Sequence, residues 1–403
     1  MNVLTPRRIR THGLLLALCL WTVYAINMAN PGMRDRQGLI KGADFLHFYT
    51  IGNLALNGRG DLLFDMQAQS ELIRRLLPEA AGYSYVALYG PQVSLLFLPF
   101  AKLSYASSLF AWLLLNTAIY GTCCFAMWLL CPQLRKFPGT VLILAAAFPG
   151  FFHLLAWGQT SGLALLCFTL ACVALQKKRR FLTGLAIGCL VFKPQLGLAA
   201  AIVLLLAQEW RIVAGAVVAA AIQLSIGWLH YGSGAMQRYG EALRHVRQVM
   251  PLLEPRPYQM HSTRAFWDLL LPWPGVSLVL YLLSSLVILY LTVRCWRSRA
   301  SLKIRYSALL IATVLIAPHL TVYDLVILAP AFLFLADWAT TGSSSPVGWL
   351  LYACYPLFLL GSLVRLTHLQ LSVPAMFALL LICHRTAESS FPPQPAPATL
   401  VTP

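Results

Sequence analysis

Acidic residues are scarce in this chain. The 403 residues include 13 aspartates and glutamates against 30 lysines and arginines, and only 11% of the sequence is charged. Soluble domains carry about 25% charged residues, so this composition excludes a soluble enzyme. The 59% hydrophobic residues exclude a disordered chain. The net charge of +17 fits cationic loops beside anionic lipid headgroups better than a nucleic-acid-binding face. The composition therefore predicts a polytopic membrane protein that contacts membrane lipids and has no nucleic-acid partner.

The sequence also lacks the short motifs of metal, nucleotide and disulfide sites. It contains no D-x-D pair, P-loop, G-x-G-x-x-G or H-E-x-x-H. A divalent-metal clamp for a nucleotide sugar is therefore unsupported, and neither a metal nor a cofactor is expected. The ten cysteines lie in or beside apolar runs without C-x-x-C spacing, which indicates small hydrophobic residues rather than a disulfide framework.

Apolar runs that could cross about 30 Å of hydrocarbon recur along the chain. Some are short and could be broken helices or hairpins, so ten to thirteen spans fit the pattern and about twelve are predicted. The expected fold is an all-α integral membrane bundle with a single polytopic domain over 1–385. A Pro-rich, disordered cytoplasmic tail is expected over 386–403. The runs lie at 12–30, 104–131, 139–155, 160–176, 181–193, 195–208, 211–230, 275–293, 305–317, 321–338, 347–364 and 370–384.

The basic residues set the predicted orientation. With the N-terminus inside, the cytoplasmic segments hold 16 of the 30 lysines and arginines, whereas the short outer loops hold only Lys193 and Arg365. The positive-inside rule therefore places both termini in the cytoplasm. The protein is expected in the inner or plasma membrane of a cell. Two long segments, 31–103 and 231–274, then form outer loops.

The first outer loop contains two short amphipathic patterns. One begins at Asp44 and presents Phe45 and Phe48, and the other covers 65–77. Both are expected to lie as helices in the plane of the membrane interface. The apolar stretch 91–103 is too short to span, so it is predicted to be re-entrant or interfacial.

Five polar breaks interrupt the apolar sequence on the predicted outer side. Irregular backbone at membrane depth is tolerated only where it lines water or other protein, so their shared side favours a single water-accessible cavity. The alternative is that each break is an ordinary interhelical loop. The breaks are GADFLHFY (42–49), LYGPQ (88–92), WGQTSG (157–162), FKPQLG (192–197) and APHLTVYD (317–324).

Several polar side chains in these breaks have both a functional and a structural interpretation. Lys193, before Pro194, could bind a phosphate or simply snorkel to lipid headgroups. Gln159 could donate to a sugar or phosphate, or could satisfy a neighbouring helix. His319 could donate to a phosphate or be a satisfied polar residue. Asp44 stands near a helix start, where aspartate is also a common N-cap.

The order of these motifs resembles that of glycosyltransferase family 87. That family comprises polyprenyl-phosphate-sugar-dependent, mannosyltransferase-like members of the GT-C superfamily. The similarity covers about residues 12–340 and departs from the family at Tyr89-Gly90-Pro91-Gln92, where relatives usually carry Tyr-Pro-Pro. It rests on DF-x-x-FY, LPF-x-x-LSY, GQ-x-x-G-L, FKPQLGL and PHL-x-x-YDLVILAP.

The resemblance implies a GT-C-like bundle and a lipid-linked donor, usually polyprenyl-phosphate mannose. It also implies an outward-facing site with a catalytic acidic residue in the first outer loop, a position that Asp44 matches. The acceptor hydroxyl needs a base and the leaving phosphate needs cations or donors, so inverting, metal-independent transfer to a lipid or glycan acceptor is expected. The donor-binding candidates are Lys193, His319, Gln159 and Arg264, and the secondary candidates are Tyr49, Tyr89, Gln195, Tyr323 and Asp324.

Two other classes of protein are compatible with the span pattern. A transporter or a lipid or sugar flippase would share the Gly- and Pro-interrupted helices. Transporters often show two similar halves, which this chain lacks, and its polar residues gather on one side rather than at the midplane. A membrane scaffold would leave the outward polar breaks without a role.

Overall fold

The computed structural model describes residues 5–254, 256–343 and 345–389. Within these ranges the regular structure consists of helices and two isolated β-bridges, Arg34–Ile40 and Met260–Thr321. The all-α class is therefore confirmed for the described chain.

Five stretches in the described residues are long and apolar enough to cross a membrane, and two bent helix pairs raise the number to seven. The α6–α7 pair bends by 43° and the α17–α18 pair by 85°. The predicted count of about twelve is not confirmed, because the helices at the other five predicted runs are only 9–17 residues long. The seven spans are α1 (Pro6–Met28), α5 (Tyr105–Trp128), α6 (Pro138–Ala146) with α7 (Pro149–Trp157), α11 (Trp210–Arg244), α14 (Pro274–Arg297), η6 (Val322–Leu328) with α16 (Ala329–Trp338), and α17 (Ser345–Leu357) with α18 (Gly361–Thr367).

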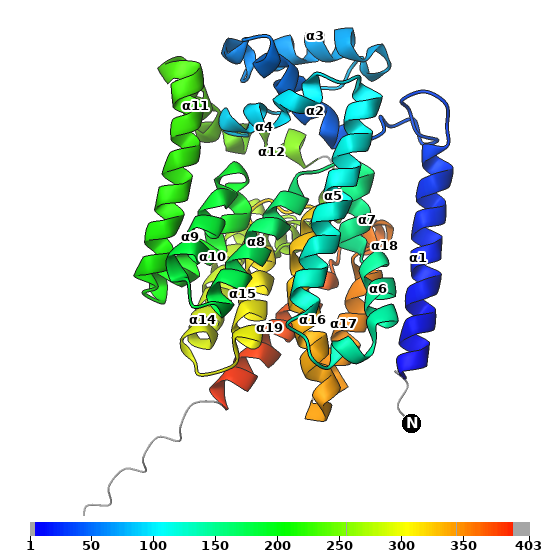
Figure 1. Cartoon of the computed structure of the whole chain (residues 1–403), viewed down its shortest axis with the longest axis vertical. Helices are drawn as coiled ribbons and strands as arrows, with labels where there is room; N and C mark the ends of the chain where they lie inside the picture. Colours follow the sequence, from blue (N-terminus) through cyan, green and yellow to red (C-terminus); the bar gives the residue numbers. More distant parts are fainter. Residues whose placement is uncertain (1–4, 255, 344, 390–403) are drawn as a thin grey trace, which may run out of the picture.

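The shorter helices fill the bundle and cover one of its ends. Figure 1 shows α2, α3 and α4 at one end, with the start of α1 and the last turn of α19 at the opposite end. The predicted orientation requires this arrangement, since it assigns the termini to one side and the first long loop to the other. The shorter helices are α2 (Ala43–Leu56), α3 (Met66–Leu76), α4 (Gln92–Ala101), α8 (Ser161–Gln176), α9 (Arg180–Gly188), α10 (Pro194–Leu206), α12 (Val246–Leu253), α13 (Thr263–Leu270), α15 (Leu302–Ile316) and α19 (Ser372–Glu388).

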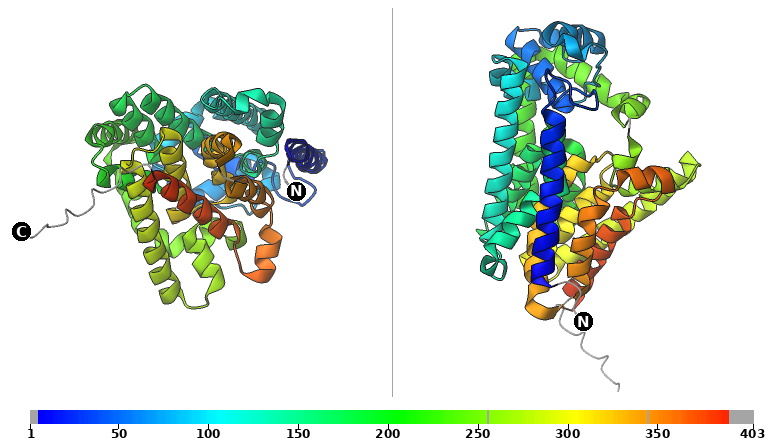
Figure 2. Two further views of the ribbon diagram at one scale, coloured as in Figure 1. Left: turned by 90° about the horizontal axis from the view of Figure 1, so that it is seen from below. Right: turned by 90° about the vertical axis from the view of Figure 1, so that its right-hand side faces the viewer.

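Helix α15 forms the centre of the bundle. Every residue from Tyr306 to Ile316 is buried, and α10, α14, α16 and α19 pack around it. By contrast, α1 buries only Gly13 and Ala17 and stands at the edge of the molecule in the left view of Figure 2. The buried α15 fixes the position of the 317–321 loop that follows it.

Helix α2 is buried in the protein and is not the interfacial helix that the sequence predicts. Every residue except Asp44 and Leu56 is buried, so no single apolar face is left for the membrane surface. Phe45 stacks on Trp112 of α5 at 6.0 Å between ring centres, and Phe48 stacks on Phe97 of α4 at 4.8 Å. Aromatic side chains of α4 and α5 therefore cover the face that was expected to meet lipid, and α4 itself is a packing partner of α2.

The C-terminal boundary also differs from the prediction. Helix α19 continues to Glu388, whereas the tail was expected to begin at 386. Its later part, 390–403, lies outside the described residues.

Candidate active site

Two glycines allow the start of α2 to lie against the end of α7. Gly42 is the N-cap of α2 and Gly158 the C-cap of α7, with φ angles of 65° and 69°, a region that glycine occupies most readily. A Cβ atom at Gly158 would lie 2.8 Å from Cβ of Phe45, and one at Gly42 would lie 2.4 Å from Cδ1 of Leu109. A side chain at Gly158 would therefore separate the α7–α8 turn from α2, and one at Gly42 would displace Leu109 of α5.

This close approach places Asp44 beside Gln159. The Gln159 side-chain amide donates to Oδ2 of Asp44 at 2.9 Å, while its Oε1 accepts the backbone N–H of Thr160 at 3.0 Å. Asn116 donates to the backbone carbonyl of Gln159 at 3.4 Å. The N-cap of α2 is Gly42, so the alternative of Asp44 as an N-cap is wrong. The carboxylate of Asp44 is instead held by Gln159, which lies between α7 and α8.

The protein around Asp44 makes its carboxyl a stronger base than an ordinary aspartate. Burial raises the pKa of Asp44 to about 6, whereas the Gln159 hydrogen bond and the charges of Lys193 and Arg256 lower this pKa and the charge of Asp324 raises it. The residue keeps a partly exposed surface. At neutral pH the carboxylate is therefore mostly ionised and able to accept a proton.

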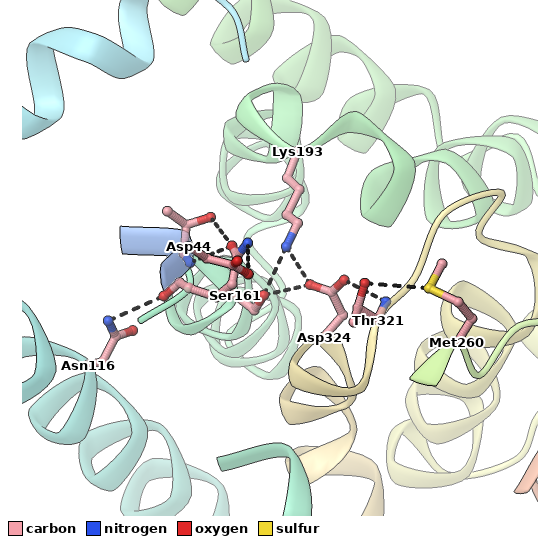
Figure 3. A network of polar contacts seen from close by, with 9 residues as sticks. Asp44, Asn116, Ser161, Lys193, Met260, Thr321 and Asp324 are labelled. Atoms are coloured by element: carbon pink, nitrogen blue, oxygen red, sulfur yellow. Dashed lines mark hydrogen bonds and ion pairs between the residues drawn. The ribbon is translucent and has the colours of Figure 1, made fainter. Parts of the chain in front are cut away.

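A second, fully buried polar group lies next to this pair. Lys193 Nζ is 2.5 Å from Oδ1 of Asp324 and 3.0 Å from Oγ of Ser161, and Ser161 donates to the same carboxylate oxygen at 2.5 Å. Asp324 also accepts the backbone N–H of Thr321. Figure 3 shows Lys193 reaching between Ser161 and Asp324. The pair is thus an enclosed salt bridge to which Ser161 and the Thr321 backbone add hydrogen bonds.

Local helix starts explain why these groups meet. Lys193 is the N-cap of α10, whose first residue is Pro194, and the proline breaks the preceding apolar run. Ser161 begins α8, and Asp324 completes a capping box with Thr321 at the start of η6. The N-terminal ends of α2, α8, α10 and η6 therefore converge around Asp44 and Lys193.

The secondary candidates differ in their distance from this centre. Tyr323 lies with its ring centre 4.9 Å from Lys193 Nζ. Tyr89 packs on Phe48 at 4.9 Å, and the charges of Lys193, Asp324 and Asp44 all affect its pKa, which burial raises. Gln195 is half-buried in the first turn of α10. Tyr49 instead donates to the carbonyl of Leu103 at 2.8 Å and belongs to the α2–α5 packing.

His319 and Arg264 form a separate cluster around Glu254. His319 Nδ1 lies 2.9 Å from Oε1 of Glu254, and Arg264 is ion-paired with the same carboxylate. The segment 319–324 connects this cluster to the Lys193–Asp324 pair, because it carries residues of both. The expectation of one common set of cations is therefore corrected to two clusters, each with its own carboxylate.

Sequence reasoning missed four residues of this region. Ser161 bonds to both Lys193 and Asp324, and Asn116 donates to the carbonyl of Gln159. Glu254 organises the second cluster, and Arg256 has its guanidinium carbon 5.0 Å from the ring centre of Trp157. Ser161 could have been found, since it stands two residues after Gln159 at a helix start. Glu254 and Arg256 lie in a long loop whose placement over the site has no local signal.

A family model of glycosyltransferase family 87 matches residues 87–318. No curated protein and no solved structure matches the chain. The matched segment contains Gln159, Ser161 and Lys193 but neither Asp44 nor Asp324. The contacts of Gln159 with Asp44 and of Lys193 with Asp324 therefore join the matched segment to residues on both sides of it.

Proposed function

Because the chain belongs to glycosyltransferase family 87, and is therefore a membrane glycosyltransferase, we propose that it uses a polyprenyl-phosphate-linked sugar as donor. The sugar in this proposal is mannose, and the acceptor is a hydroxyl of a lipid or glycan. The active site is the region around Asp44 where the N-terminal ends of α2, α8, α10 and η6 meet. It lies at the end of the molecule formed by α2, α3 and α4. In this proposal the protein lies in the inner or plasma membrane. This end of the molecule faces outward, and both termini lie in the cytoplasm.

The environment of Asp44 is the observation that carries the proposal. The residue is partly exposed, and burial raises the pKa of its carboxyl to about 6, which suits a general base near neutral pH. In the proposed step the acceptor oxygen attacks C1 of the sugar and passes its proton to Asp44. The bond from C1 to the phosphate oxygen breaks, its electron pair leaves with the phosphate, and the configuration at C1 inverts. No metal takes part in this step.

The electrostatics of the convergence support an anionic donor headgroup. The N-terminal ends of α2, α8 and α10, which carry the positive ends of the helix dipoles, lie around the same region. Gln159 and Lys193 lie on one side of the proposed headgroup, with His319 and Arg264 contributing from the second cluster. In the free protein Asp324 pairs with Lys193, and Glu254 pairs with Arg264 and His319.

The test is to identify a labelled product. Membranes containing the protein are incubated with radiolabelled polyprenyl-phosphate mannose and a lipid extract, and wild type is compared with Asp44→Asn. A covalent labelled glycolipid or glycan that forms only with wild type supports the proposal. Movement of intact labelled donor across the membrane without covalent transfer would contradict it and favour a flippase.

A further inference from the structure

The cations expected to bind the donor phosphate already face carboxylates. Lys193 pairs with Asp324, and both His319 and Arg264 pair with Glu254. A buried ion pair is electrically neutral as a unit and loses stability when one partner is drawn away. A donor headgroup that adds negative charge to this region therefore needs a cation that has no carboxylate partner.

Arg256 meets this requirement. Among the described residues, no carboxylate lies within ion-pair distance of it, and its guanidinium carbon stands 5.0 Å from the centre of the Trp157 ring. Trp157 ends α7 and directly precedes Gly158 and Gln159, the residues that contact α2. The charge of Arg256 also acts on Asp44. The free cation is therefore held on the turn that positions the candidate base.

Contacts of the residues before and after Arg256 fix the position of its segment. Two residues before it, Glu254 is held by Arg264 and His319. Four residues after it, Met260 forms a β-bridge with Thr321 and accepts a hydrogen bond from the Thr321 hydroxyl at 3.6 Å. The segment 256–260 thus runs between the two clusters, and the stacked guanidinium lies along this path.

A guanidinium held over an aromatic ring suits a phosphate. The cation–π contact involves no hydrogen-bond acceptor atom, so the N–H groups remain available for two parallel hydrogen bonds to phosphate oxygens. The phosphodiester of a lipid-linked sugar carries one negative charge, and the lipid phosphate released after transfer carries up to two. The demand for positive charge therefore grows as the bond between C1 and the phosphate oxygen breaks.

We propose that Arg256, positioned by Trp157, binds the phosphate of the lipid-linked donor and of the lipid phosphate product. This inference rests on the proposed function and adds a residue to it. The acceptor proton goes to Asp44, and the electron pair of the broken C1–O bond goes to the phosphate beside Arg256.

Binding of farnesyl phosphate to the purified full-length protein in detergent tests the proposal. We expect wild type to bind farnesyl phosphate more tightly than farnesol or inorganic phosphate at equal concentration. Arg256→Gln should weaken farnesyl phosphate binding by about 10–100-fold, and Arg256→Lys by less. Arg74→Gln, an exposed arginine of α3, is the matched control and should bind as wild type. Arg256→Gln binding within twofold of wild type would overturn the assignment.

Two further arms locate the cause of a negative result. Asp44→Asn should still bind farnesyl phosphate, because it lacks the base and not the phosphate site. If Asp44→Asn is inactive in transfer while Arg256→Gln binds normally, only the assignment of Arg256 fails. If Asp44→Asn transfers sugar normally, the assignment of Asp44 as the base fails, and if wild type itself forms no labelled product, the proposed function fails. Arg256-dependent binding of inorganic phosphate as tight as that of farnesyl phosphate would overturn the assignment to a lipid phosphate.

Discussion

Gln159 donates a 2.9 Å hydrogen bond to the carboxylate of Asp44, across 115 positions of sequence. Gln159 follows the glycine that ends α7, and Asp44 follows the glycine that begins α2. The bond therefore depends on the two glycines that allow these helix ends to touch. It also connects α2, which precedes the matched residues, to the segment that matches the family model.

The first prediction concerns pH. Asp44 accepts a proton only when ionised, and its pKa is raised to about 6, so transfer should fall as the pH drops through about 6 and level off above it. Gln159→Leu removes a hydrogen bond that lowers this pKa, so the acidic limb should move to higher pH. Rates measured from pH 4.5 to 8.5 check this, with Gln67→Leu on the exposed side of α3 as control. An unchanged acidic limb in Gln159→Leu would show that Gln159 does not set the pKa of the catalytic base.

The second prediction concerns the close approach of α2 and α7. Gly158→Ala places a Cβ atom 2.8 Å from Cβ of Phe45, whereas Gly58, with a similar φ of 66°, has nothing within 4 Å. Both substitutions carry a left-handed strain of roughly 1–2 kcal/mol, and Gly158→Ala should lose further stability because its Cβ atom overlaps Phe45. Only Gly158→Ala should also lose most of its transfer activity. Thermal denaturation and initial rates of the two variants make the comparison, and equal activities would contradict it.

The third prediction separates structure from donor binding at Lys193. Lys193→Met leaves Asp324 buried without its counter-charge and should lower the free energy of unfolding by about 3–5 kcal/mol. Adding Asp324→Asn should restore most of that loss. If Lys193 also contributes to the headgroup site, the double variant should still need more donor for half-maximal rate. A double variant with normal donor use would make Lys193 purely structural.

The fourth prediction concerns orientation in the membrane. Lys102, after α4, and Lys177, after α8, are both exposed and lie in predicted outer and cytoplasmic loops. In a cysteine-free background, Lys102→Cys should react with an impermeant maleimide added outside intact cells. Lys177→Cys should react only after the membrane is opened. The reverse pattern would invert the proposed topology.

Several features of the site could be predicted from the sequence because they are local. A glycine or proline beside a polar residue marks a helix end, and four such breaks supply Asp44, Gln159, Lys193 and Asp324. Partners brought together by tertiary packing could not be predicted. The pattern of Phe45 and Phe48 is typical of an interfacial helix, but Phe97 and Trp112 arrive from later helices and bury it.

The balance of charges was equally inaccessible to sequence reasoning. Lys193 and His319 look equivalent in the sequence, since each adjoins a proline in a polar break. Their carboxylates come from η6 and from the segment after α12, and no periodicity links those segments. The same long-range packing sets Arg256 on Trp157.

The role of Asp44 is tested most directly by the transfer rate of Asp44→Asn with polyprenyl-phosphate mannose and the acceptor identified in the labelling experiment. Asparagine keeps the size and the hydrogen-bonding oxygen but cannot take up the acceptor proton. We expect a normally inserted, folded protein whose rate is about 10²–10⁴-fold lower than wild type. Asp61→Asn, which changes an exposed aspartate of the same loop, should retain the wild-type rate. Near-normal transfer by folded Asp44→Asn would contradict the role of Asp44 as the base.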